Sequence, residues 1–185
     1  MTTYSLLPFT DQTTPWASSP LALAIFAHVT ATDSQLSLGY ELIGDIRAIA
    51  FADVNSKPQR RDNLWEQTCF ECFLAPQHSR QYWEFNLSPS RDWNCYRFED
   101  YRRGMMPEPA WHTAPFQIDQ QIKQSDRYLL TCRLDLRPLF SQPVPLQLGI
   151  TMVVADYLGN LSYWALSHPV PKADFHQRKS WLITL

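Results

Sequence analysis

Period-two alternation of apolar and polar side chains is the feature that most limits what this chain can fold into. It recurs in short runs, whereas the 3.6-residue periodicity of an amphipathic helix is hard to find. In residues 128–136, for example, Tyr128, Leu130, Cys132 and Leu134 alternate with a more polar set. We expect strands at 36–42, 68–74, 81–87, 93–99, 116–124, 128–136, 146–155, 161–166 and 181–185.

Turn signals such as Ser88-Pro89-Ser90 and 156–160 separate these runs. Many short strands with turns at fairly even spacing predict an all-β fold, an antiparallel β-sandwich of jelly-roll type, with little helix beyond a short turn at 137–140. The composition agrees, because 14% of the residues are aromatic and Pro (14) outnumbers Gly (5). A chain of 185 residues without a repeat or clear linker predicts one domain over 1–185.

The charge pattern excludes several classes of partner. The net charge is −2 and the 16 Lys and Arg residues are scattered, so we expect no nucleic-acid partner. The apolar stretch 21–29 is too short to span a membrane, and we expect no membrane partner. The N-terminus lacks the pattern of a signal peptide, which predicts a soluble, cytoplasmic protein with reduced cysteines. The oligomeric state stays open.

Splitting the strands by parity predicts a second face that mixes charged and apolar residues. In 81–87, Tyr82, Glu84 and Asn86 lie opposite the apolar set, and in 68–74 Glu71 shares its face with two apolar residues. Charged groups on a half-apolar surface should be paired or hydrogen-bonded, as in a concave site for a polar ligand. The same pattern fits an ordinary outer face with cross-strand ion pairs. The predicted polar set is Glu71, Glu84, Asn86, Arg97 and Arg133.

The run Cys69-Phe70-Glu71-Cys72 has the C-x-x-C spacing of zinc and redox sites. A zinc knuckle needs a turn between its cysteines, and a thioredoxin-like pair needs a helix after the first one; neither is indicated here. Residues three apart on a strand point to opposite faces, so one metal could not take both sulfurs. We therefore expect no metal site and buried, inert thiols.

Glu71 and Glu84 could also form a catalytic pair. A glycosidase needs two carboxyls at a defined separation, one of them with a raised pKa. Arg97 and Arg133 would tend to keep both carboxylates ionised, which disfavours a general acid. We therefore predict no catalytic residue, and an enzyme acting on a sugar stays an alternative.

Longer runs of the sequence resemble a known family. They are RDNLWEQTCFECF at 61–73, EFNLSPS at 84–90 with Trp93, YRRGM at 101–105, LSYWALSHP at 161–169, and Asp174-Phe175-His176. They are similar to the DOMON-like bacterial domain family, which is related to DOMON domains and to family 9 carbohydrate-binding modules. The resemblance extends from residue 36 to 185 and implies a β-sandwich of about ten strands with a ligand site on one face or edge.

The resemblance also implies roles for single residues. In the sugar-binding relatives, two tryptophans clamp a sugar ring, and a glutamate on the strand after the first one accepts hydrogen bonds from its hydroxyls. Trp65 and Trp164 would be the two walls and Glu71 the acceptor, with structural core as the alternative for both tryptophans. The predicted ligand-binding set is Trp65, Glu71, Glu84, Asn86, Arg97, Arg133 and Trp164, supported by His168 and His176.

The expected function is a non-catalytic domain that binds a carbohydrate or a sugar-like polar metabolite, with no cofactor. A b-type haem domain is one alternative, because haem-binding relatives use Met with His or Lys, although Met105, Met106 and Met152 match no ligand position. An enzyme using Glu71 or Glu84 is another, and a protein-interaction module is the third. The sequence shows no calcium-binding loop and leaves a structural calcium ion open.

Overall fold

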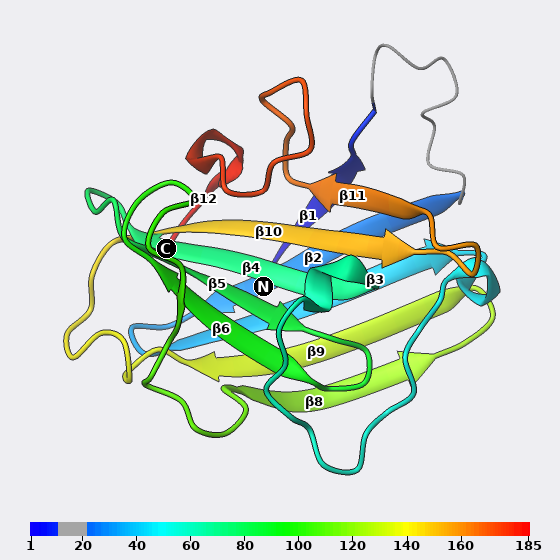
Figure 1. Cartoon of the computed structure of the whole chain (residues 1–185), viewed down its shortest axis with the longest axis horizontal. Coiled ribbons are helices and arrows are strands. Elements are labelled where there is room, and N and C mark those ends of the chain that lie inside the picture. Colours follow the sequence, from blue (N-terminus) through cyan, green and yellow to red (C-terminus); the bar gives the residue numbers. More distant parts are fainter. Residues whose placement is uncertain (11–21) are drawn as a thin grey trace.

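The computed structural model describes residues 1–10 and 22–185, which consist almost entirely of antiparallel strands (Figure 1). The strands are β1 (Thr2–Pro8), β2 (Leu23–Ala31), β3 (Gln35–Gly44), β4 (Cys69–Pro76), β5 (Tyr82–Leu87), β6 (Trp93–Phe98), β7 (Met106–Pro107), β8 (Phe116–Lys123), β9 (Arg127–Asp135), β10 (Leu146–Ala155), β11 (Leu161–Ala165) and β12 (Ile183–Thr184). Three short 3-10 turns accompany them: η1 (Ile46–Ala48), η2 (Leu64–Glu66) and η3 (Arg178–Ser180). Among the described residues, no helix is long and apolar enough to cross a bilayer.

The strands follow one path in the order β7-β6-β5-β4-β10-β11-β1-β2-β3-β9-β8, with β12 paired to β10. β1 links two sheets, because residues 2–6 pair with β2 whereas Leu7 and Pro8 pair with β11. We call β7, β6, β5, β4, β10, β11 and β12 the first sheet, and β2, β3, β9 and β8 the second sheet. The strands of the first sheet cross in front of those of the second in Figure 1, and the predicted antiparallel β-sandwich is confirmed.

Each segment in which we expected a strand contains one, and β1, β2 and β7 are three further strands that we did not predict. β2 is an almost continuous apolar run, and only the structure shows that it buries Ile25, Ala27 and Val29 on one face. β7 has two residues, too few for an alternation. The expected turn after β9 is present, where the backbone amides of Leu139 and Phe140 both donate to the Leu136 carbonyl.

The main core lies between the two sheets. It is built from the face of each strand that alternation marks as apolar, including Phe70 and Cys72 of β4, Phe85 of β5 and Met152 of β10, which pack against the second sheet. Tyr40 of β3 reaches across and donates a 2.6 Å hydrogen bond from its hydroxyl to the backbone carbonyl of Glu71. This core fixes which side chains of β4, β5 and β10 must point the other way.

The outer face of the first sheet is buried as well, although outer faces of sandwiches usually meet water. A second apolar cluster covers it, made of Cys69, Phe73, Ala75, Tyr82, Tyr96, Phe98, Val153, Ala165, Phe175 and Trp181. The last two belong to the segment after β11, residues 167–182, which we call the C-terminal strap. The strap packs so closely that a Cβ built on Gly149 would meet the Trp181 ring at 2.2 Å.

The strap is tied down by polar contacts at its far end. Arg178 donates to the backbone carbonyls of Pro76 and Ser79, and Gln147 Nε2 donates to the Trp181 carbonyl at 2.9 Å. The Trp181 indole N–H donates to the Phe175 carbonyl at 2.8 Å. These bonds hold Phe175 and His176 over the sheet.

Strand parity separates the two cysteines of the C-x-x-C run as predicted. Cys72 lies in the core between the sheets, whereas Cys69 lies in the outer cluster. Both are free and buried, and burial raises the pKa of both thiols well above their ordinary value. Within the described ranges, no group of three His, Cys, Asp or Glu side chains could hold a metal ion.

Candidate ligand-binding site

A cavity of about 420 Å³ opens on the outer face of the first sheet, between η2, the loop after β6 and the C-terminal strap. Its volume is in the range of small-ligand sites. The lining combines aromatic rings with carboxyl groups and one histidine. The lining residues are Trp65, Glu66, Glu71, Phe73, Glu84, Phe98, Arg102, Met105, Val153, Leu161, Tyr163, Ala173, Phe175 and His176.

A row of polar side chains crosses the sheet beneath this cavity. The strand register pairs Asn94 with Asn86, Asn86 with Glu71, and Glu71 with Thr151, so all four lie on the same face of β6, β5, β4 and β10. None is more than 2% exposed. Buried polar groups need hydrogen-bond partners, so this row is costly unless something completes it.

Glu71 is the least satisfied member of the row. Its Oε2 accepts a 3.3 Å hydrogen bond from the Thr151 hydroxyl, while its Oε1 is buried and has no partner. Burial, reinforced by the nearby Glu84, raises the pKa of Glu71 well above its usual value. The environment therefore favours a neutral Glu71 carboxylic acid, whose O–H is a donor that an ionised carboxylate lacks.

Glu84 sits two residues before Asn86 on β5 and is the diagonal neighbour of Glu71. Asn86 Nδ2 donates to Glu84 Oε1 at 2.8 Å, and His176 Nε2 lies 3.7 Å from Glu84 Oε2. Burial raises the pKa of Glu84 from 4.5 to about 7, while the bond from Asn86 and the charge of Arg102 oppose the rise. The amide oxygen of Asn86 has no donor.

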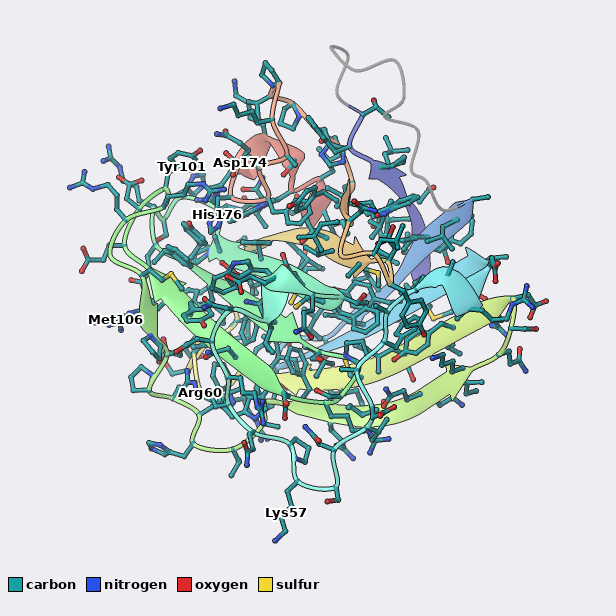
Figure 2. The ribbon with its side chains drawn as sticks, turned by 45° about the vertical axis from the view of Figure 1, so that its right-hand side comes forward. Lys57, Arg60, Tyr101, Met106, Asp174 and His176 are labelled. Atoms are coloured by element: carbon teal, nitrogen blue, oxygen red, sulfur yellow. The ribbon has the colours of Figure 1, made fainter. Side chains whose placement is uncertain are left out.

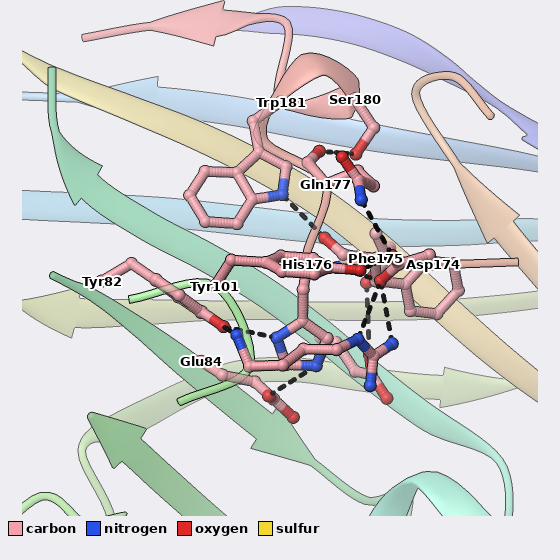
Figure 3. A network of polar contacts seen from close by, with 12 residues as sticks. Tyr82, Glu84, Tyr101, Asp174, Phe175, His176, Gln177, Ser180 and Trp181 are labelled. Carbon is pink, nitrogen blue, oxygen red and sulfur yellow. Dashed lines mark hydrogen bonds and ion pairs between the residues drawn. The ribbon is translucent and has the colours of Figure 1, made fainter. Parts of the chain in front are cut away.

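His176 connects Glu84 to Tyr82 (Figure 3). Its Nδ1 lies 2.7 Å from the Tyr82 hydroxyl, which also accepts the backbone N–H of Arg102 at 3.2 Å. We therefore assign the Tyr82 proton to the bond with Nδ1, which places the ring proton of neutral His176 on Nε2, facing Glu84. Burial, with a smaller effect of Arg102, lowers the pKa of His176 to about 4, so the ring is neutral at pH 7.

Asp174 joins the strap to the loop after β6, beside His176 (Figure 2). Its carboxylate accepts a 2.5 Å bond from the Tyr101 hydroxyl and pairs with Arg102 at 2.8 Å. Gln177 Nε2 also donates to this carboxylate, at 3.2 Å. The one guanidinium that lines the cavity is thus already engaged by a carboxylate.

Aromatic residues form the walls. Trp65 is half-buried on η2 and meets the Tyr96 ring edge-on, with ring centroids 5.7 Å apart. Asn63, just before η2, adopts a left-handed conformation (φ 61°) that turns the chain into this short helix. Tyr163 and Phe175 meet edge-on with centroids 6.0 Å apart. Rings at these positions could contact the apolar face of a bound ligand.

The structure brings together four of the nine residues that the sequence singled out: Trp65, Glu71, Glu84 and His176 all line the cavity. Asn86 lies directly beside them in the buried polar row. The remaining four, Trp164, Arg97, Arg133 and His168, lie elsewhere.

Trp164 is not a second wall. It pairs with Met152, which faces the core between the sheets, and it is itself only 2% exposed in that core. Its neighbour Tyr163 has the opposite parity and lines the cavity instead. The expected pairing of Trp65 with Trp164 across one site is therefore absent, and the alternative, structural core, describes Trp164.

The two predicted arginines sit on other surfaces. Arg97 pairs with Met106 at the edge of the first sheet and donates to its sulfur at 2.8 Å, whereas the neighbouring Tyr96 shares the face of Glu84. Arg133 belongs to the second sheet and forms an exposed ion pair with Asp119 at 2.6 Å. Parity within each strand placed both arginines on a polar face. Only the pairing between strands shows that this face is not the one that carries Glu71 and Glu84. His168, the fourth, bonds the Leu7 carbonyl at 2.9 Å.

Several residues of the site were missed. Phe175 and Asp174 lie in the strap, which shows no alternation, and Arg102 lies in a loop with φ of 51°. Thr151 was included in the apolar strand β10. One signal was available: Thr151 is the polar residue between Ile150 and Met152, and its parity is opposite to the core.

Comparison with known proteins adds likeness of fold. No family model matches the sequence, and no curated protein matches it. A candidate carbohydrate-binding protein from Bacteroides uniformis superposes with a TM-score of 0.63 at 12% identity, covering 98% of this chain and 84% of that chain. The DOMON-like relationship stays a prediction.

Two structures of a family 9 carbohydrate-binding module from Caldicellulosiruptor kristjanssonii are more distant. The complex with cellotriose has a TM-score of 0.49 at 16% identity and covers 80% of this chain and 68% of that chain. The complex with glucose has a TM-score of 0.45 at 16% identity, with 80% and 69% covered.

Proposed function

We propose that this domain binds a carbohydrate or a sugar-like polar metabolite in the cavity between Trp65 and the C-terminal strap, without catalysing a reaction. The observation that carries the proposal is the Glu71 carboxyl group, which lines the cavity, is 2% exposed and has an oxygen without a partner. A buried polar atom without a hydrogen-bond partner costs about 1–3 kcal/mol. A ligand that supplies the missing hydrogen bond recovers this cost.

The chemistry of the lining fits a sugar. A sugar ring has apolar C–H faces, which aromatic rings such as Trp65 and Phe175 can cover, and an edge of hydroxyls that both donate and accept. Glu71 as a neutral acid and Glu84 near its titration midpoint offer donors and acceptors on the same floor. The likeness of fold to the Bacteroides uniformis protein supports the same class of ligand by analogy.

A second candidate function, acid–base chemistry on a sugar, is favoured by the unequal environments of the two carboxyls. Burial raises the pKa of Glu71 well above its usual value and that of Glu84 to about 7, and enzymes use such differences in carboxyl environment to assign an acid and a base. An assay with aryl glycosides decides between the two. Turnover that is lost in Glu71→Gln while sugar binding persists would establish the enzyme.

A haem group does not fit this cavity through His176. Met105 and His176 both line it and would be the natural axial pair. A ligating histidine must offer a ring nitrogen without a proton, but Nδ1 is bonded to the Tyr82 hydroxyl, and this bond leaves the ring proton on Nε2. The assigned tautomer therefore argues against haem ligation by His176.

The proposed function is tested by calorimetric titration of the full chain with glucose, galactose, mannose, their 2-amino derivatives, cellobiose and lactose. We expect saturable binding of at least one member. If none of them binds at millimolar concentration, the proposal is overturned. A Kd of about 1 mM corresponds to a binding free energy of about −4 kcal/mol.

A further inference from the structure

The charges around the cavity are unbalanced. Among the residues that the structure describes, three carboxyl groups line it, Glu66 on η2, Glu71 on β4 and Glu84 on β5, and the one lining cation, Arg102, is already paired with Asp174. His176, the remaining basic group, is neutral at pH 7. Among the described residues, the other titratable groups near the floor carry no positive charge: Cys69 on β4, Tyr82 on β5, Tyr96 on β6, Tyr163 on β11, and Asp62, which accepts a bond from the Tyr96 hydroxyl.

The floor also leaves two buried oxygens without a hydrogen-bond partner. Glu71 Oε1 and Asn86 Oδ1 are both buried without a partner, and they belong to directly paired residues of β4 and β5. Once Glu71 is ionised, these oxygens are two adjacent acceptors, which a group that brings several N–H bonds would satisfy. An ammonium group brings three donors and no acceptor, whereas a hydroxyl brings one donor.

The walls suit a cation as well. Trp65, Phe73, Phe98, Tyr163 and Phe175 line the cavity, and the faces of such rings attract positive charge. A cation seated on the polar row would thus meet carboxyl groups below and aromatic rings around it.

We propose that the ligand of this cavity carries a protonated amine, as an amino sugar does, and that the ammonium group is held by Glu71 and Asn86 with Glu84 beside them. This inference rests on the proposed function, because it specifies the class of sugar. Binding an ammonium ion favours the ionised form of the carboxyl pair. A proton therefore passes from the pair to the solvent as the ligand enters.

The test compares amino sugars with their neutral counterparts: glucosamine with glucose, and galactosamine with galactose, at about pH 7, where an α-amino group is still mostly protonated. Titration of the full chain should show the amino sugar of at least one pair binding about tenfold or more tightly than its counterpart. Repeating it in buffers of different ionisation enthalpy should show net release of protons for the amino sugar alone.

Glu71→Gln keeps the shape of the side chain and removes its charge, so it should reduce the preference for the amino sugar to roughly twofold. Asp135→Asn, which removes an exposed carboxylate from the second sheet, is the matched control and should keep the preference. Unfolding curves of both variants check that they are folded. The comparison of amino sugars with neutral sugars uses the unmodified chain, so it does not depend on the folding of a variant.

The outcomes separate the two proposals. Equal binding of amino and neutral sugars overturns the inference and leaves the proposed function standing. Binding of neither class overturns both. A preference that survives Glu71→Gln unchanged overturns the placement of the ammonium group.

Discussion

The Tyr82 hydroxyl and Nδ1 of His176 lie 2.7 Å apart although 94 residues separate them in the chain. This bond joins the C-terminal strap to the centre of the first sheet and turns the other ring nitrogen of His176 toward Glu84. The C-terminal strap therefore forms one wall of the cavity, and the position of this wall depends on the sheet beneath it.

Tyr82→Phe should destabilise the domain by about 1–3 kcal/mol, because it leaves His176 Nδ1 without a donor and the Arg102 amide without an acceptor. The free energy of unfolding in urea measures this. Tyr157→Phe is the control, since that side chain is exposed and should change the value little. Equal effects of the two variants would contradict the assigned bond.

Trp65→Ala should abolish ligand binding and leave the fold intact, because Trp65 is half-buried on a short turn at the rim of the cavity. Trp164→Ala is the matched variant and should cost about 3–5 kcal/mol of stability, since Trp164 fills the core between the sheets. Thermal unfolding and sugar titration of both proteins separate the two roles. A Trp65→Ala protein that unfolds would show that Trp65 is core.

The contribution of Glu84 to the stability of the domain should fall as pH rises from about 5 to 7. Burial raises its pKa from 4.5 to about 7, so its contribution is complete below the unfolded value and is lost as pH rises through the folded one. His176 acts in the opposite sense, because its folded pKa of about 4 is below 6.5 and its contribution is lost as pH falls toward 4. The two effects partly cancel between about pH 5 and 6.5.

Glu84→Gln isolates the first effect. The variant should lose stability less steeply between about pH 5 and 7 than the unmodified chain, by up to about 1.4 kcal/mol per pH unit. Urea unfolding at a series of pH values measures both slopes, and the carboxyl carbon shift of Glu84 reports its pKa directly. Parallel slopes would mean that Glu84 titrates normally.

Gly149→Ala should destabilise the strap, because the new methyl group would overlap the Trp181 ring that packs on Gly149. We expect a cost of about 1–3 kcal/mol and faster hydrogen exchange in residues 167–182. Gly39→Ala is the control for location, because Gly39 lies in the second sheet. Its new Cβ would also be crowded, by Cβ of His28 at 3.1 Å, but hydrogen exchange in the strap should stay unchanged. Unchanged exchange in the strap after Gly149→Ala would contradict this packing.

Much of the fold could be predicted from alternation alone, because a half-buried strand must place apolar residues at every second position. Glu71 and Glu84 were correctly assigned to one face, since both lie opposite strongly apolar sets on β4 and β5. Parity within one strand, however, does not say how that strand is aligned with its neighbours. For this reason Arg97 was assigned to the face that Tyr96 occupies.

The strap could not be predicted for a different reason. Residues 167–182 contain one short 3-10 turn and no strand, so no periodicity marks them. Their positions are set by packing of Phe175 and Trp181 on a face that alternation describes as polar or solvent-exposed. A buried outer face is a tertiary property, and the local sequence of β4 or β5 carries no signal for what covers it.

The most direct test of the central claim is a nuclear magnetic resonance titration of the labelled full chain with the tightest-binding sugar. We predict saturable amide shifts clustered on β4, β5, η2 and residues 173–176, the elements that surround the cavity. Shifts gathered instead at the open end of the sandwich, around Thr32, Val144 and Leu185, would contradict it. So would the absence of saturable shifts with every sugar tested.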